Sequence, residues 1–168
     1  MSERRPFHLA ALLLALLLLL GFPAGSLAQI QASPDETGTG LVRSLEGLRD
    51  LDYQSWQVVA YRPGPAGPDA AVVLRIVSYP GRVRLDHPTP LQVRSGRRQW
   101  SLADITLASP KLSSDNRAAA AEFDLTPLLA DLRLNRPLRL QLPGVFVELP
   151  VPPYVVAEWR RLPQELAG

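Results

Sequence analysis

Apolar and polar residues alternate in short runs along most of the chain, which is the pattern of half-buried β-strands. The clearest run is 55–61, where Trp56, Val58 and Ala60 share one face and their neighbours share the other. Gly and Pro residues separate the runs, and the 17 prolines of the chain argue against long helices. The pattern predicts a mainly β fold, an antiparallel β-sandwich or barrel of about 7–9 short strands.

Three pairs of runs predict β-hairpins. Residues 55–61 and 70–77 flank a loop, 63–69, that is too rich in Pro and Gly for a regular element. Because 70–77 is apolar almost throughout, we expect a central strand that is buried on both faces. The other two hairpins join 91–94 to 99–104 and 138–142 to 145–149. Further strands are predicted at 41–48, 82–86 and 121–125, and a helix is the alternative for 41–48.

Two short helices are expected among the strands. Pro127 can start a single turn over 126–132, since proline loses no needed donor at the first helical position. Near the C-terminus, 154–162 places four apolar residues on one face at helical spacing. They are Val155, Val156, Trp159 and Leu162. This second helix is expected to cover one end of the sandwich or barrel.

The first 28 residues follow a different pattern. Two arginines precede an unbroken Leu/Ala stretch at 9–20, and Ser26 and Ala28 are the small residues that a signal peptidase accepts. We therefore expect a signal peptide at 1–28, a mature protein that begins at Gln29, and no transmembrane segment after cleavage. The apolar stretch is shorter than the roughly 20 residues of a spanning helix. An uncleaved N-terminal anchor is the alternative.

Export limits the possible functions, because cytosolic metabolism, nucleotide chemistry and gene regulation take place elsewhere. Residues 29–40 are polar without an apolar period and predict a flexible tether. Residues 41–168 predict a single β-rich domain. The formal net charge is +2 for the whole chain and about +1 without the signal, so the mature domain is nearly neutral. Nucleic acid is not an expected partner outside the cytosol. Cysteine is absent, and packing alone must stabilise the fold.

Groups that could perform catalysis are few. His87 is the single histidine after the signal, and the chain has neither a Cys nucleophile nor a Gly-x-Ser-x-Gly turn. Clustered His and Cys ligands and Asp-rich calcium loops are also missing. The sequence therefore predicts no catalytic residue, no metal and no cofactor. A small hydrolase with a cryptic site near His87 is one alternative. The other interpretation is a histidine that packs beside Pro88 and Pro90 and hydrogen-bonds a loop carbonyl.

The most prominent charged cluster consists of arginines on neighbouring predicted strands and their turn. Its members are Arg82, Arg84, Arg94, Arg97 and Arg98. If the strands pair, these side chains form one basic patch that could bind an acidic protein surface or anionic lipid head groups. The alternative is a solvated face in a chain that favours arginine, since Lys111 is its single lysine.

Six segments carry a resemblance to a known family. They are Arg43-Ser44-Leu45, Leu48-Arg49-Asp50, Ser55-Trp56-Gln57-Val58-Val59, Tyr79-Pro80-Gly81, His87-Pro88-Thr89-Pro90-Leu91 and Pro152-Pro153-Tyr154-Val155-Val156-Ala157-Glu158-Trp159. With these six segments in this order, the chain resembles a family of short exported cyanobacterial proteins of unknown function. The resemblance implies the periplasm or the thylakoid lumen and brings no established activity. Such proteins usually carry a glycine in the turn before the tryptophan, where this chain has 51–55.

The expected function is that of a non-enzymatic accessory or binding protein, which contacts a membrane-associated protein complex or an anionic surface through the arginine patch or the sheet surface. Besides the hydrolase, a second alternative is a small-ligand carrier with a cavity between sheet and terminal helix. Trp56, Trp100 and Trp159 are expected to fill the core rather than to line a ligand pocket.

Overall fold

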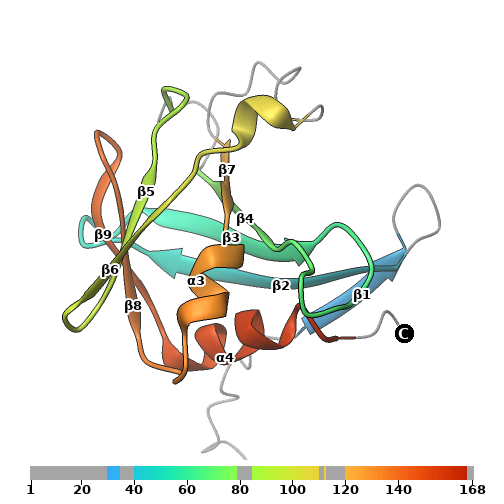
Figure 1. Cartoon of the computed structure of the whole chain (residues 1–168). Coiled ribbons are helices and arrows are strands. Elements are labelled where there is room, and N and C mark those ends of the chain that lie inside the picture. The colour runs from blue at the N-terminus through green and yellow to red at the C-terminus, as the bar shows by residue number, and fades with distance from the viewer. Residues whose placement is uncertain (1–29, 35–39, 79–84, 110–111, 113–119, 166–168) are drawn as a thin grey trace, which may run out of the picture.

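The structure is a computed structural model, and it describes residues 30–34, 40–78, 85–109, 112 and 120–165. These residues form two antiparallel sheets, with strand orders β1-β2-β3-β4-β7 and β6-β5-β8-β9 (Figure 1). The predicted mainly β fold is therefore confirmed. The strands are β1 (Ile30–Pro34), β2 (Gly40–Arg49), β3 (Ser55–Arg62), β4 (Val73–Val77), β5 (Leu91–Ser95), β6 (Arg98–Leu102), β7 (Ala120–Asp124), β8 (Leu138–Leu142) and β9 (Phe146–Val151).

The sheets face each other as a sandwich and are joined at two corners. On one side, the chain after β6 pairs with β7 through a bridge between Asp104 and Phe123. On the other side, the N–H of Leu51 in the β2–β3 turn donates to the carbonyl of Glu148 in β9, at 3.2 Å. These contacts join the two sheets along both sides, as in a partly closed barrel. The two ends of the sandwich therefore form two separate surfaces.

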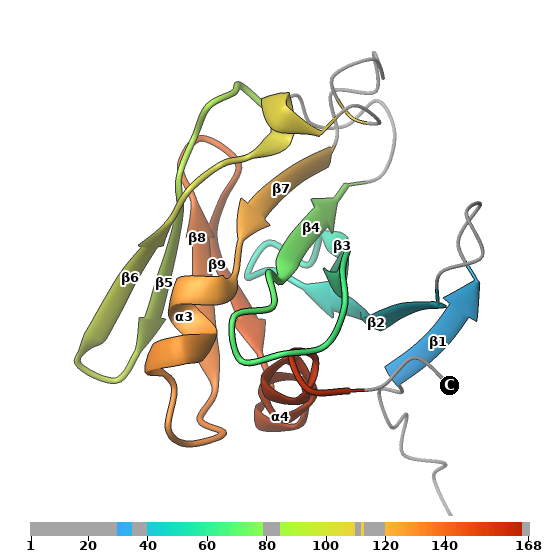
Figure 2. The ribbon, with the colours of Figure 1, turned by 45° about the vertical axis from the view of Figure 1, so that its right-hand side comes forward.

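The helices connect strands of the two sheets or follow the last strand. The 3-10 helix η1 (Thr106–Ala108) follows β6, and α3 (Thr126–Asp131) connects β7 to β8. The last helix, α4 (Pro153–Arg161), runs across the end of the sandwich away from η1 (Figures 1 and 2). The prediction that the C-terminal helix covers one end is confirmed. We call the covered end the helix end and the other the open end.

The apolar faces predicted from the alternation are buried. Trp56, Val58 and Ala60 all point from β3 into the core, as expected. In β4, Leu74 and Ile76 are fully buried, whereas Arg75 and Val77 face outward and are only partly covered. The prediction that this strand is buried on both faces is therefore wrong.

The outward face of β4 carries a charged side chain with a well-defined partner. The Nε of Arg75 donates to the Glu122 carboxylate on β7 at 2.8 Å, and the hydroxyl of Tyr61 on β3 donates to the same carboxylate at 2.6 Å. Burial, and next the hydrogen bond to Glu122, raise the pKa of Tyr61 to about 12. These three side chains tie three strands together and explain why an apolar run contains an arginine.

At the helix end, α4 buries the four apolar side chains that its spacing predicted. It also buries Glu158, whose Oε2 accepts a hydrogen bond from the Ser44 hydroxyl on β2 at 2.7 Å. Nearby on β2, Glu46 has a pKa raised by burial and then by the charge of Glu158, while a hydrogen bond from Tyr154 opposes the shift. The helix therefore rests on an apolar face with a polar seam along one side.

The turn between β2 and β3 is organised by a buried carboxylate. Oδ1 of Asp50 accepts hydrogen bonds from the N–H groups of Asp52 and Gln54, at 2.9 Å each, and Oδ2 accepts one from the Trp56 indole at 2.8 Å. Within this turn Tyr53 has a φ of 60°, a conformation that glycine adopts without strain. Asp50 thus holds the turn in which Tyr53 adopts this conformation.

Two sequence predictions concern segments outside the hairpins. Residues 30–34, predicted as part of a flexible tether, form β1 and pair with β2. An edge strand of this kind is held by backbone hydrogen bonds, so hydropathy gives little sign of it. For the strand predicted at 82–86, residues 82–84 lie outside the described residues, while Leu85 and Asp86 belong to no strand.

Candidate functional site at the open end

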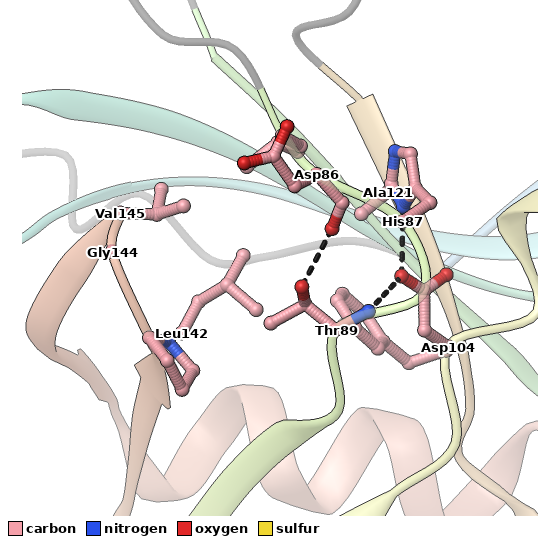
Figure 3. Close-up of a pocket in the computed structure, with 11 residues that line it drawn as sticks. Asp86, His87, Thr89, Asp104, Ala121, Leu142, Gly144 and Val145 are labelled. Atoms are coloured by element: carbon pink, nitrogen blue, oxygen red, sulfur yellow. Dashed lines mark hydrogen bonds and ion pairs between the residues drawn. The ribbon is translucent and has the colours of Figure 1, made fainter.

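A pocket of about 90 Å³ lies at the open end, between the segment before β5 and the β8–β9 turn (Figure 3). One wall is polar and carries Asp86, His87, Thr89 and Asp104. The facing wall is mostly apolar, with Leu85, Ala121, Phe123, Leu142 and Val145 beside Pro143 and Gly144. Sandwich ends of this type, where loops meet above a packed core, are common places for ligand sites.

The apolar wall depends on the tight turn that joins β8 to β9. The N–H of Val145 donates to the carbonyl of Leu142 at 3.0 Å, and Gly144 has a φ of +75°, which favours glycine. This turn was predicted from the Pro-Gly pair, and it is what brings Leu142 and Val145 to face the polar wall.

On the polar wall, His87 is held by a buried carboxylate. Its Nδ1 lies 2.7 Å from Oδ2 of Asp104, whose side chain is 2% exposed. The other ring nitrogen, Nε2, lies on the side of the ring away from Asp104 (Figure 3). This contact differs from the expected hydrogen bond to a loop carbonyl, because the partner of Nδ1 is the Asp104 carboxylate.

Asp104 is surrounded by hydrogen-bond donors. Its Oδ2 accepts from the N–H of Thr89 at 2.8 Å, and its Oδ1 accepts from both the N–H and the hydroxyl of Thr106. Burial raises the pKa of Asp104, but the hydrogen bonds from His87, Thr106 and Thr89 together outweigh that effect and lower it. The carboxylate is therefore ionised at neutral pH.

An ionised Asp104 fixes the tautomer of His87. Since a carboxylate can only accept, Nδ1 of His87 carries the proton and donates it. In the neutral form of the ring Nε2 is then an acceptor, and within the described residues it has no hydrogen-bond partner. The site thus holds an oriented imidazole among the residues that line the pocket.

The described lining holds no serine or cysteine that could act with His87 as a nucleophile. Thr89 supplies its one hydroxyl, and this group donates to the carbonyl of Asp86 at 2.6 Å. Among the described residues, no three His, Cys, Asp or Glu side chains converge as a metal site. The arrangement resembles the base and orienting acid of a triad without the third member.

Of the predicted arginine patch, the structure describes Arg94, Arg97 and Arg98, and these three do not line the pocket. Arg94 on β5 is 3.9 Å from Glu148 on the outer face of the second sheet. Arg98 lies opposite Ser95 in the register of β5 and β6, and therefore on the other face of the sheet. The structure brings these two residues onto adjacent strands but not onto one surface. Arg82 and Arg84 lie outside the described residues.

Arg98 is also engaged by neighbouring groups. It pairs with the Asp131 carboxylate after α3 and stacks over the Trp100 ring, 5.3 Å from its centroid. Hydrogen bonds from the Trp100 indole and then from Arg98 lower the pKa of Asp131. Arg97 is exposed and lies in the β5–β6 turn. This turn is at the opposite end of β5 from the segment that lines the pocket (Figure 2).

The three tryptophans are core residues in the main. Trp56 and Trp159 are buried, which confirms the prediction for them, and Trp100 is packed against the core at its edge.

In the described part of the chain, no helix is both long and apolar enough to cross a membrane.

Comparison with protein families places the chain. A family model described as a protein of unknown function (DUF3122) matches residues 28–162. The chain belongs to this family. No curated protein matches the chain, and no solved structure matches it either. The family match agrees with the resemblance seen in the sequence to a family of unknown function, and it leaves the site to be interpreted from its own geometry.

In this DUF3122 chain, sequence reasoning identified His87 but missed Asp104. The two residues are separated by β5 and β6, so their contact depends on how the chain crosses from β6 to β7. A local signal was present: Asp104 is followed two residues later by Thr106, and an Asp side chain often accepts the N–H of the second residue after it. That pattern indicates a fixed carboxylate, although it does not indicate which histidine it meets.

Proposed function

We propose that the chain is an exported, non-enzymatic binding protein of the periplasm or thylakoid lumen, and that the pocket at the open end is where it binds. The observation that carries this proposal is the His87–Asp104 pair, a buried carboxylate that orients an imidazole at the edge of a pocket. Orienting a side chain in this way is typical of binding and catalytic sites. Export is supported by the pattern of residues 1–28.

The size of the pocket argues for recognition of part of a larger molecule. Its volume of about 90 Å³ is below the roughly 150 Å³ of cavities that enclose a benzene ring. A group of a few non-hydrogen atoms fits, while the rest of the bound molecule must lie outside. A side chain or chain end presented by a membrane-associated protein complex meets this description, in keeping with an accessory role.

A pull-down tests this proposal. The tagged exported protein is used to recover partners from detergent-solubilised membranes of the producing cell, with wild type, His87→Ala and the double variant Arg97→Glu/Arg98→Glu in parallel. The proposal predicts that His87→Ala loses the recovered partner and that the double variant keeps it. Loss only in the double variant would assign binding to the arginine turn. Mass measurement of the exported chain tests cleavage before Gln29.

A small hydrolase is the second candidate, and the His87–Asp104 pair is the observation that favours it. An imidazole oriented by a carboxylate can act as a general base toward water without a protein nucleophile. Hydrolysis of a panel of ester and amide substrates by the wild type, together with loss of that activity in His87→Ala, would support this candidate. Equal rates in the two proteins would remove it.

A further inference from the structure

The pocket's hydrogen-bonding groups identify the chemistry that it accepts. We propose that it binds a primary ammonium group on a short apolar stem, such as the end of a lysine side chain or of an alkylamine. This inference rests on the proposed binding function and names the class of group that is bound.

The first argument is that the donors of the polar wall are already used within the protein. Nδ1 of His87 donates to Asp104, the N–H of Thr89 donates to Asp104, and the hydroxyl of Thr89 donates to the Asp86 carbonyl. Of the side-chain groups that remain on this wall, the carboxylate of Asp86 is an acceptor, and Nε2 of His87 is an acceptor in the neutral form of the ring. A ligand that donates hydrogen bonds would find these two acceptors.

The second argument is the charge of the wall. Among the described residues that line the pocket, Asp86 and Asp104 each carry a negative charge, and the single imidazole does not offset both even when it is protonated. Asp86 is exposed and lies beside His87 at the rim (Figure 3). An anionic ligand would therefore be repelled, and a cationic one attracted.

The third argument is the facing wall, which requires an apolar stem. Phe123 and Leu142 are buried core residues whose surfaces form part of the pocket, and Val145 packs beside them. A stem of about four carbons removes water from this apolar wall, which favours binding. An ammonium at the end of such a stem can reach the acceptors of the polar wall.

The experiment compares three probes of equal length with different heads: n-butylamine, 1-butanol and butyrate. Each is titrated into the isotope-labelled exported protein at about pH 8, where an ordinary histidine is neutral, and binding is followed by the NMR signals of His87, Thr89 and Val145. We expect n-butylamine to shift these signals with a millimolar Kd, at least about tenfold tighter than butyrate, with 1-butanol between them.

Two variants strengthen the comparison. Asp86→Asn removes one exposed charge and is expected to weaken n-butylamine binding about two- to fivefold while it leaves 1-butanol binding unchanged. His87→Ala is expected to abolish the preference for the amine. The Asp86→Asn variant keeps the test valid if His87→Ala does not fold, because the Asp86 side chain is exposed.

The outcomes separate this inference from the proposed function. If butyrate binds as tightly as n-butylamine and shifts the same signals, the inference is overturned but the pocket remains a binding site. If none of the three probes shifts those signals, the inference is overturned and the pocket is also removed from the proposed function. An unchanged preference in both variants would likewise contradict the inference.

Discussion

The two ends of the sandwich differ in what their side chains do. At the helix end, α4 covers the core with Trp159 and its apolar neighbours, and its buried Glu158 has a hydroxyl partner on β2. At the open end, the core reaches a pocket, and a buried carboxylate orients a histidine whose second ring nitrogen has no partner among the described residues. The helix end is built for packing, and the open end holds polar groups in a fixed geometry.

This difference indicates that apolar packing at the helix end stabilises the fold, whereas the open end is the proposed binding site. Packing an amphipathic helix over a sheet end buries apolar area that a small, cysteine-free domain needs. A polar pocket contributes less to stability, because its groups are only partly covered. Substitutions at the two ends should therefore separate effects on folding from effects on binding.

The largest effect is expected for Trp159→Ala at the helix end. Removing this buried ring leaves a cavity under α4 and should lower the free energy of unfolding by about 3–5 kcal/mol. Denaturant unfolding of the purified protein measures this change. Trp100→Ala is the matched control, since Trp100 is only partly buried and should cost less. Equal losses for the two variants would show that α4 does not seal the core.

The next largest effect is expected for Asp104→Asn at the open end. An amide cannot accept the four hydrogen bonds that the carboxylate receives, so we expect a loss of about 2–4 kcal/mol at neutral pH. Because the folded-state pKa of Asp104 is lowered, its stabilisation is present above the unfolded pKa, near 3.8, and is lost as the pH falls below it. Unfolding curves of wild type and variant should converge below about pH 4. A constant difference at all pH values would contradict this account.

A smaller effect of opposite sign is expected for Glu46→Gln at the helix end. The folded-state pKa of Glu46 is raised above its ordinary value of 4.5, so the folded protein binds this proton more tightly and loses stability as the pH rises above 4.5. The variant should be more stable than wild type at neutral pH, by less than about 1 kcal/mol because the site is partly solvated. Melting temperatures at pH 4 and about pH 7 measure it. A variant that is less stable than wild type at neutral pH would disprove the role of Glu158 in the shift.

The smallest effect on folding is expected for Arg97→Glu in the β5–β6 turn. The side chain is exposed, so the free energy of unfolding should change by no more than about 0.5 kcal/mol. Partner recovery should also stay the same, because this turn lies away from the pocket (Figure 1). Denaturant unfolding and the pull-down measure the two quantities. Loss of the partner in this variant would restore the arginine turn as a binding surface.

The sequence predicted the elements of this fold better than the contacts of its site. The hairpins and the C-terminal helix follow from local alternation and spacing, as Val58 in β3 and Val155 in α4 show. The strand β1 escaped notice because backbone pairing at a sheet edge needs no apolar pattern. Asp104 escaped notice because it meets His87 only after β6 crosses to β7, a long-range contact that spacing does not encode.

The arginine prediction shows a related limit. Arg94 and Arg98 are close in sequence and lie on paired strands. Arg98 lies opposite Ser95, the residue after Arg94, so the two arginines are on opposite faces of the sheet. Each then meets a carboxylate from a distant segment, Glu148 or Asp131. Charge clusters read from sequence therefore indicate which strands carry charge, while the register decides whether the charges converge.

Photocrosslinking tests most directly the claim that the open end is the binding surface. A photoreactive phenylalanine derivative is introduced at Val145, on the pocket wall, or at Arg97, in the turn at the other end, and the producing cells are irradiated. The account predicts a crosslinked partner from position 145 and none from position 97. Crosslinks from position 97 alone, or from neither position, would contradict it.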